Sequence, residues 1–435
     1  MHDVLDPRDL VPDEAEQLLS AGYPAADLLV QARAAAAAGD LAALAEVSDQ
    51  LDSLAPSIEY DEPSDLETLD RLLPEHPPTA PAGNLQDRIK GAWLGRCVAN
   101  TMGKPVEGLS RAEVYSYLSA AKAWPLSGFV PLLQPLPDDV SHLHESAAEA
   151  SEGNFDAIPR DDDIDWTILS LFMLESHGTA LRTDDIARHW LDRIPFTQTY
   201  TAERAAYRNL IEGLRPPRTA TSRNPYREWI GALIRMDAYG YVNPGDPVAA
   251  ARMALTDAVL SHTANGVYGA TWAAALVAEA LVVDKPADAL RTALSVVPAA
   301  SRLAVSQAAL LDIFHQGGTA AEASDWIDTE LGHYNWVHTL NNAAIISAAL
   351  LWGEDDFVRT VGLAVGAGRD TDSTAATVGS VFGALHGSAA IPERLVRPSG
   401  GVIRSAVRGF DRITVDELAA RTNAVRLALA EGNRS

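Results

Sequence analysis

Two rows of small residues constrain the fold of this chain more than any other feature. Small side chains recur at every fourth position in two places, at Gly91, Gly95, Ala99 and Gly103 and again at Ala375, Gly379, Gly383 and Gly387. Glycine inside a helix costs roughly 1 kcal/mol relative to alanine, so a row of glycines requires a compensating contact. Small side chains on one face let neighbouring helix backbones approach closely. We therefore expect both rows to lie in the crowded centre of a helical bundle.

Helical patterns dominate the chain from Asp87 onward, and alternating β-branched runs are scarce. Ala/Leu-rich stretches predict helices over residues 161–176, 200–213, 247–263, 265–282, 286–295, 303–315, 340–352, 356–366 and 373–387. Proline and glycine fall between these stretches, where loops are expected. No period of 20 to 50 residues recurs, which argues against a solenoid. The fold class predicted is all-α, with a main domain of about 300 residues.

The first part of the chain differs from the rest in charge. Residues 1–86 hold 18 Asp and Glu but only 3 Lys and Arg. Apolar spacing predicts short helices at Glu14–Ala21, Ala25–Ala38 and Leu41–Leu54. The proline-rich segment Pro74–Pro81 then predicts an extended, semi-rigid linker. We interpret residues 1–83 as an acidic helical extension, which serves as a partner or self-association surface or remains a poorly ordered tail.

Composition excludes several classes of function. A net charge of −25 argues against non-specific binding to nucleic acid or to anionic membranes, because both need basic surface. The single cysteine, Cys97, excludes an intrachain disulfide and a cysteine-rich zinc site. The longest apolar run, Trp272–Val283, contains Glu279 and is too short to span a bilayer. With no signal-peptide pattern at the start, a cytoplasmic protein is expected.

Two acidic clusters about two hundred residues apart carry the chemistry. Asp161, Asp162 and Asp163 precede an apolar stretch, and Asp370, Asp372 and Ser373 follow a glycine-bearing loop. Helix capping explains one such carboxylate easily, but three in a row beside a core crowd like charges together. A cation would compensate for that crowding, and a set of oxygen ligands suits magnesium, calcium or manganese better than zinc. The clusters predict a metal-dependent enzyme.

Several motifs in the chain resemble those of the ADP-ribosylglycohydrolase family, of the dinitrogenase reductase-activating glycohydrolase type. Segments 87–95 and 103–108 look like its N-terminal signature, and the Asp161 triplet resembles its Thr-Asp-Asp motif. Residues 368–373 resemble its Gly-x-Asp-Thr-Asp-Thr/Ser motif, and segments 261–265 and 340–343 fall in the family's order. The resemblance covers residues 87 to 395. It implies a compact orthogonal helical bundle over residues 84–435, of which 396–435 is a C-terminal helical extension.

The resemblance also implies an activity and a cofactor. Such proteins remove ADP-ribose from a protein side chain or a small acceptor, using two Mg²⁺ ions in a cleft, with Mn²⁺ as an alternative. Carried over by position, the metal ligands are Asp161, Asp162, Asp163, Asp370, Asp372 and Ser373. Glu107 matches a family glutamate on a mobile loop. Either Glu107 or Asp163 is expected to handle the proton during bond cleavage.

The remaining site residues concern the substrate and the departures from the family. Substrate-binding roles are expected for His262, Asn265, Tyr268, Asn341, Gly368 and Arg369, although a lone histidine such as His262 is more often a satisfied core residue. Asp161 stands where most relatives have threonine, Arg96 where many relatives have aspartate after Gly95, and Asp165 where relatives often have glutamine. These departures indicate a divergent subgroup.

Three alternatives remain open at the level of sequence. The same chemistry could act on an ADP-ribosylated or NAD-derived metabolite, or the protein could bind ADP-ribose without cleaving it. A metal-dependent phosphohydrolase is a third possibility, but the His-Asp pairs and the basic phosphate loop expected of one are missing from the sequence. The expected partner is an ADP-ribosylated protein or small molecule, not nucleic acid or membrane. The sequence does not define the acceptor group or the oligomeric state.

Overall fold

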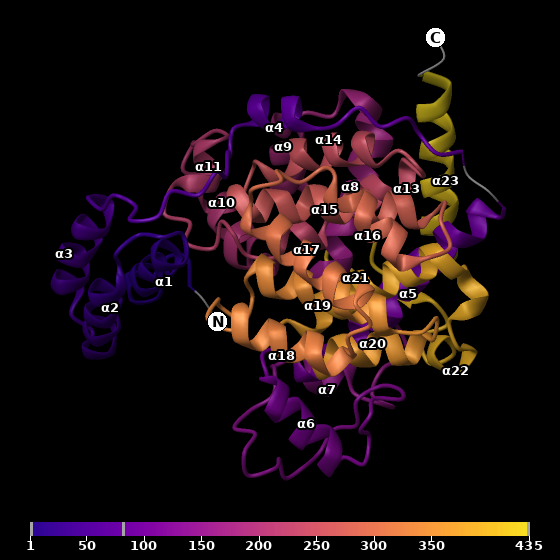
Figure 1. Cartoon of the computed structure of the whole chain (residues 1–435), viewed down its shortest axis with the longest axis horizontal. Coiled ribbons are helices and arrows are strands. Elements are labelled where there is room, and N and C mark those ends of the chain that lie inside the picture. Colours follow the sequence, from indigo (N-terminus) through magenta and orange to yellow (C-terminus); the bar gives the residue numbers. More distant parts are fainter. Residues whose placement is uncertain (1–2, 81–82, 433–435) are drawn as a thin grey trace.

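The protein is almost entirely helical, as the sequence predicts (Figure 1). The computed structural model describes residues 3–80 and 83–432, and within them it has 23 α-helices and two short strands. Residues 1–2, 81–82 and 433–435 lie outside the described residues, so Pro81 of the predicted linker and the last three residues of the predicted C-terminal extension are not described. The all-α prediction is confirmed.

The acidic extension forms helices α1 (Pro7–Ser20), α2 (Ala26–Ala38), α3 (Leu41–Asp52) and α4 (Leu66–Leu72). Helix α1 begins earlier than the predicted Glu14, because Asp6 caps its free amides and a proline occupies its first position. Helices α1 to α3 lie beside the main body around a small apolar core of their own (Figure 1). Helix α4 lies against the main body, where Leu69 joins the large core.

Helices α5 (Leu85–Gly103) and α21 (Thr371–His386) form the centre of the main body. Their rows of small residues pack directly against one another: a β-carbon added to Gly91 would lie 2.5 Å from the carbonyl oxygen of Gly383. The two rows therefore lie in the crowded centre, as expected, and they pack against each other in one helix–helix contact. Gly387 is an exception within its row, because it has a φ of +80° and ends α21 instead of packing inside the helix.

Three further helices, α8 (Asp162–His177), α15 (Ala264–Ala280) and α19 (Thr339–Trp352), are buried over most of their length. The other helices are α6 (Arg111–Ala120), α7 (Ala147–Ala150), α9 (Thr183–Arg193), α10 (Thr201–Ile211), α11 (Arg218–Thr221), α12 (Gly231–Ile234), α13 (Asp237–Val242), α14 (Pro247–Ala258), α16 (Pro286–Leu294), α17 (Arg302–His315), α18 (Ala320–Glu330), α20 (Phe357–Gly366) and α22 (Glu393–Val396). Helix α14 ends five residues earlier than predicted, because the amides of Leu260 and Ser261 donate to carbonyls three residues back, in turns that end the α-helix.

The C-terminal part contains the strands β1 (Val402–Ile403) and β2 (Ile413–Thr414), which pair antiparallel, and helix α23 (Val415–Gly432). This part is tied to the start of α8. Asp165 accepts hydrogen bonds from the Ser405 hydroxyl at 2.6 Å and the Ala406 amide at 3.0 Å. The C-terminal part therefore holds the first turn of α8 in place. None of the helices in the described chain combines the length and the apolarity that a membrane crossing requires.

Candidate active site

The first acidic cluster lies at the N-terminus of α8. Asp161 is the N-cap residue, and its Oδ1 accepts a hydrogen bond from the Asp163 amide at 2.9 Å. Capping therefore accounts for one of the three carboxylates, as the ordinary role of Asp at a helix start suggests. Asp163 is fully buried, and Asp162 lies half-buried in the first turn. The other two carboxylates need a different explanation.

The second acidic cluster lies at the N-terminus of α21, which is anchored to the end of α5. The Thr371 hydroxyl donates to the carbonyl of Gly103 at 2.8 Å. Gly368 just before it has a φ of +70°, and a β-carbon there would lie 2.6 Å from the Leu109 carbonyl oxygen, so the loop requires glycine. Residues 368–369 pair with residues 108–110 through backbone hydrogen bonds. This pairing fixes the loop that carries Glu107 beside Asp370.

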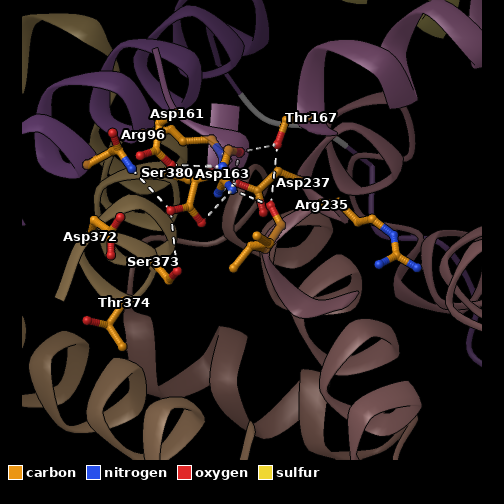
Figure 2. A network of polar contacts seen from close by, with 12 residues as sticks. Arg96, Asp161, Asp163, Thr167, Arg235, Asp237, Asp372, Ser373, Thr374 and Ser380 are labelled. Atoms are coloured by element: carbon orange, nitrogen blue, oxygen red, sulfur yellow. Dashed lines mark hydrogen bonds and ion pairs between the residues drawn. The ribbon is translucent and has the colours of Figure 1, made fainter. Parts of the chain in front are cut away.

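The two clusters converge, as Figure 2 shows for Asp161, Asp163 and Asp372. Two groups of carboxylates offer oxygens within 4.8 Å of one another: Glu107 with Asp370 and Asp372, and Asp161 with Asp163 and Asp372. Asp372 belongs to both groups. The Ser373 hydroxyl links the second acidic cluster to the first by donating a hydrogen bond to Asp163 Oδ2 at 3.3 Å. Of the predicted ligands, Asp162 and Ser373 lie outside these two groups among the described residues.

Arg96 fixes the position of Asp163 by hydrogen bonds to its main chain (Figure 2). Its fully buried guanidinium donates to the Asp163 carbonyl at 2.7 and 3.0 Å and to Asp237 Oδ2 at 2.7 Å, and it also contacts the carbonyl of Ile234. The planar donor fork of arginine suits such a fixed set of acceptors. Arg96 therefore joins α5, α8 and α13 at the point where the first cluster begins.

Lys104 is the site residue that sequence reasoning missed. It follows α5 directly, and its ammonium nitrogen lies 2.7 Å from Asp161 Oδ2, 2.8 Å from Asp372 Oδ2 and 2.9 Å from Glu107 Oε2. The residue stood inside a recognised motif, Gly103-Lys104-Pro105, and three positions before Glu107. That spacing was the only signal for its role. His144, whose Nδ1 lies 3.4 Å from Glu107 Oε2, comes from an irregular segment and gave no sequence signal.

The packed charges shift the ionisation of the carboxyl groups. Burial, with the charge of Asp372, raises the pKa of Glu107 to about 8. Burial, with the charge of Asp161, raises the pKa of Asp162 to about 7 and holds that of Asp163 well above its usual range. Burial acts in the same direction on Asp161, but the Lys104 charge outweighs it and lowers the pKa of Asp161 to about 2. In the absence of a metal ion, the cluster keeps some of its protons at neutral pH.

The residues fit a divalent metal ion. Asp163 Oδ1 and Asp372 Oδ1 are buried, and neither has a hydrogen-bond donor within the described chain. Buried carboxylate oxygens without donors are costly unless a cation compensates for them. Both atoms belong to residues of the same group of three carboxylates. The donors are carboxylate oxygens, which suit magnesium or manganese.

The residues expected to bind substrate fall into two sets, and in the first set Gly368 and Arg369 lie beside the carboxylates. Gly368 and Arg369 lie in the loop before Asp370, where the Arg369 guanidinium donates to Asp328 Oδ1 at 2.6 Å. Asn341 donates to the carbonyl of Asn335 at 2.9 Å. These contacts leave the substrate-binding role of each residue a prediction.

The other set contacts the acidic extension or the core. Asn265 donates to Glu62 Oε2 at 2.8 Å, and the Tyr268 hydroxyl donates to the carbonyl of Pro63. His262 is buried, and its Nε2 accepts a hydrogen bond from the Ala232 amide at 3.3 Å. His262 therefore has the satisfied surroundings of a core histidine, and Asn265 and Tyr268 hold the extension in place.

The comparisons with known proteins identify the family. Residues 81–429 match the ADP-ribosylglycohydrolase family, so the chain belongs to the ADP-ribosylglycohydrolase family. Among solved structures, one titled "ADP-ribosylglycohydrolase-related protein complex" matches with 22% identity and a TM-score of 0.43, over 79% of this chain and 99% of that one. No curated protein matches the sequence. The family assignment makes the protein a hydrolase of the ADP-ribosylglycohydrolase type.

Proposed function

We propose that the protein is a magnesium-dependent hydrolase that cleaves the glycosidic bond between ADP-ribose and an acceptor, which is a protein side chain or a small molecule. The observation that supports this most is the convergence of two carboxylate groups that share Asp372. The buried oxygens Asp163 Oδ1 and Asp372 Oδ1, which lack donors, give a divalent ion its ligands. Manganese is a chemically similar substitute.

The anionic surroundings suit the reaction. Cleavage at the anomeric carbon of ribose passes through an oxocarbenium-like state, which nearby carboxylates stabilise. A bound magnesium ion would hold ribose hydroxyls and lower the pKa of a water molecule. The chain itself supplies Asp163 and Asp372 as oxygen ligands with Asp161 beside them, and Arg96 keeps Asp163 in position.

Glu107 is the residue that we assign to the proton. Its side chain is 15% exposed, whereas that of Asp163 is 2% exposed, so a water molecule reaches Glu107 more readily. Lys104 and His144 both lie against Glu107 Oε2, which leaves Oε1 to accept a proton from the attacking water. Asp163 Oδ2 already accepts hydrogen bonds from Asn100 and Ser373. Asp163 therefore serves as a metal ligand and not as the base.

The experiment that tests the proposal is a panel of acceptors. The protein is incubated with arginine-, serine- and small-molecule-linked ADP-ribose, with and without Mg²⁺, and free ADP-ribose is followed. We expect release from at least one acceptor, and a loss of about 10²- to 10⁴-fold in kcat for Glu107→Gln with little change in KM. A preference for a small-molecule acceptor would identify a metabolite hydrolase.

Two outcomes of the same panel would overturn the proposal. Measurable binding of ADP-ribose without release from any acceptor would make the protein a binder. Inorganic phosphate that appears without ADP-ribose would indicate a phosphohydrolase. A Glu107→Gln variant as active as the wild type would reject only the assignment of the proton to Glu107.

A further inference from the structure

Lys104 lies where the two carboxylate groups meet. Its ammonium contacts Glu107 from one group, Asp161 from the other and Asp372, which both groups share. The three contact distances, 2.9, 2.7 and 2.8 Å, are those of close ion pairs, and the contacts to Glu107 and Asp372 are also hydrogen bonds. The lysine side chain is only 9% exposed, so the protein interior surrounds this charge. The ammonium therefore bridges the two groups as a cation would.

A lysine ammonium and a divalent ion compete for the same carboxylate oxygens. The ammonium is a compact point charge with three donors, and here its three contacts are to three different carboxylates. A divalent ion that used the same oxygens would meet an unscreened positive charge at close range. Lys104 already pairs with Glu107 Oε2, Asp161 Oδ2 and Asp372 Oδ2, so a second ion that bridged the two groups would have to share these oxygens with the ammonium. The lysine leaves room for one ion more readily than for two.

The oxygens that Lys104 leaves free mark where that ion would bind. Lys104 contacts the Oδ2 atoms of Asp161 and Asp372. Asp372 Oδ1 and Asp163 Oδ1 remain buried without a hydrogen-bond donor in the described chain. Both oxygens belong to the group formed by Asp161, Asp163 and Asp372. The Arg96 guanidinium lies 3.8 Å from Asp163 Oδ1 without donating to it, so the buried oxygens that lack a donor are concentrated in one of the two groups.

We propose that Lys104 takes the place of one divalent cation, so that the site binds a single divalent ion, on Asp163 and Asp372. Asp161 then supplies the counter-charge for the lysine. This explains why a carboxylate stands where a threonine hydroxyl is expected in relatives. The inference deepens the proposed function, because it rests on a divalent ion at these carboxylates. It replaces the expectation of two ions with one ion and one lysine.

The test counts bound Mn²⁺ in the purified full-length protein. Electron paramagnetic resonance gives the number of ions per chain and distinguishes an isolated ion from a coupled pair. We expect one isolated Mn²⁺ in the wild type and a coupled pair in Lys104→Met, which keeps the side-chain length but removes the charge. Lys90→Met, which removes an exposed lysine paired with Asp416, should still bind one ion.

Each other count overturns the inference. Two ions in the wild type, or none, contradicts a single site, and one ion in Lys104→Met shows that the lysine does not exclude the second. If Lys104→Met folds poorly, the double variant Lys104→Met with Asp161→Thr keeps the charges balanced and should bind two ions. Failure to release ADP-ribose would concern the proposed function alone, because the ion count does not depend on turnover.

Discussion

Gly95 of α5 and Gly379 of α21 touch through their backbones. A β-carbon on Gly95 would lie 2.0 Å from the carbonyl oxygen of Gly379, and one on Gly379 would lie 2.2 Å from that of Gly95. Lys104 follows the end of α5, and Asp372 lies in the first turn of α21. The contact between the two glycines therefore sets the distance between helices that carry opposite sides of the carboxylate site.

Gly95→Ala should destabilise the protein, because the added methyl group has no space without separating the two helices. Overpacking of this kind costs roughly 1–3 kcal/mol, and occasionally more. Urea unfolding of the purified protein measures the change in the free energy of unfolding. Gly362→Ala is the matched control within α20, since the nearest atom to its β-carbon would lie 3.3 Å away. Equal effects of the two substitutions would contradict the close packing of α5 and α21.

Arg302→Met should weaken the contact between the acidic extension and the main body. The Arg302 guanidinium lies 2.7 Å from Glu62 and 2.9 Å from Glu228, and these carboxylates are only 5% and 4% exposed. Removing one partner leaves buried charges uncompensated, which costs about 3–5 kcal/mol. Measuring the free energy of unfolding of Arg302→Met at pH 7 tests this predicted loss. Arg291→Met, on the exposed surface of α16, should change it by less than about 0.5 kcal/mol.

The metal-free protein should lose stability as the pH rises from about 5 to about 8. The pKa of Glu107 is raised to about 8, mainly by burial, and that of Asp162 to about 7. In the unfolded chain both groups ionise near their ordinary values, so in this range the folded protein binds more protons than the unfolded one. The stability that these two carboxyl groups contribute is fully present below their pKa in the unfolded chain. It is lost as the pH rises through their pKa in the folded protein.

Thermal unfolding in the presence of a chelator measures this dependence. The melting temperature should fall across that pH range, and Glu107→Gln should make the fall shallower because one of the titrating groups is gone. Mg²⁺ should stabilise the protein more at pH 8 than at pH 6, since the ion competes with protons for the carboxylates. An unchanged slope in Glu107→Gln would contradict the raised pKa of this group.

The sequence predicted the central helices and the two acidic clusters better than it predicted the surroundings of the site, and the ligand roles stay a prediction. Short-range patterns mark the small residues around Gly95 and Gly379 and the aspartates around Asp163 and Asp372. Such patterns can be recognised in the sequence alone, because their members lie close together in the chain. Lys104 has no such pattern, because its role comes from carboxylates that lie far apart in the chain. The role of Lys104 therefore follows from its tertiary contacts with these carboxylates.

The same reason explains why the sequence did not predict the contacts of the residues in α15. The substrate-binding role of Asn265 stays a prediction, and its side chain donates to Glu62, which lies about two hundred residues earlier. An acidic extension with helical periodicity predicts helices, and those helices are present. Periodicity does not predict which surface the extension covers.

The most direct test of the central claim is ADP-ribose release measured as Mg²⁺ is titrated, in the wild type and in Asp372→Asn. Asp372 belongs to both carboxylate groups, so its loss should abolish the magnesium-dependent release. Asp284→Asn, which removes an exposed carboxylate paired with Arg88, should behave like the wild type. Release that does not depend on Mg²⁺, or that persists in Asp372→Asn, would contradict a metal-dependent glycohydrolase site at these carboxylates.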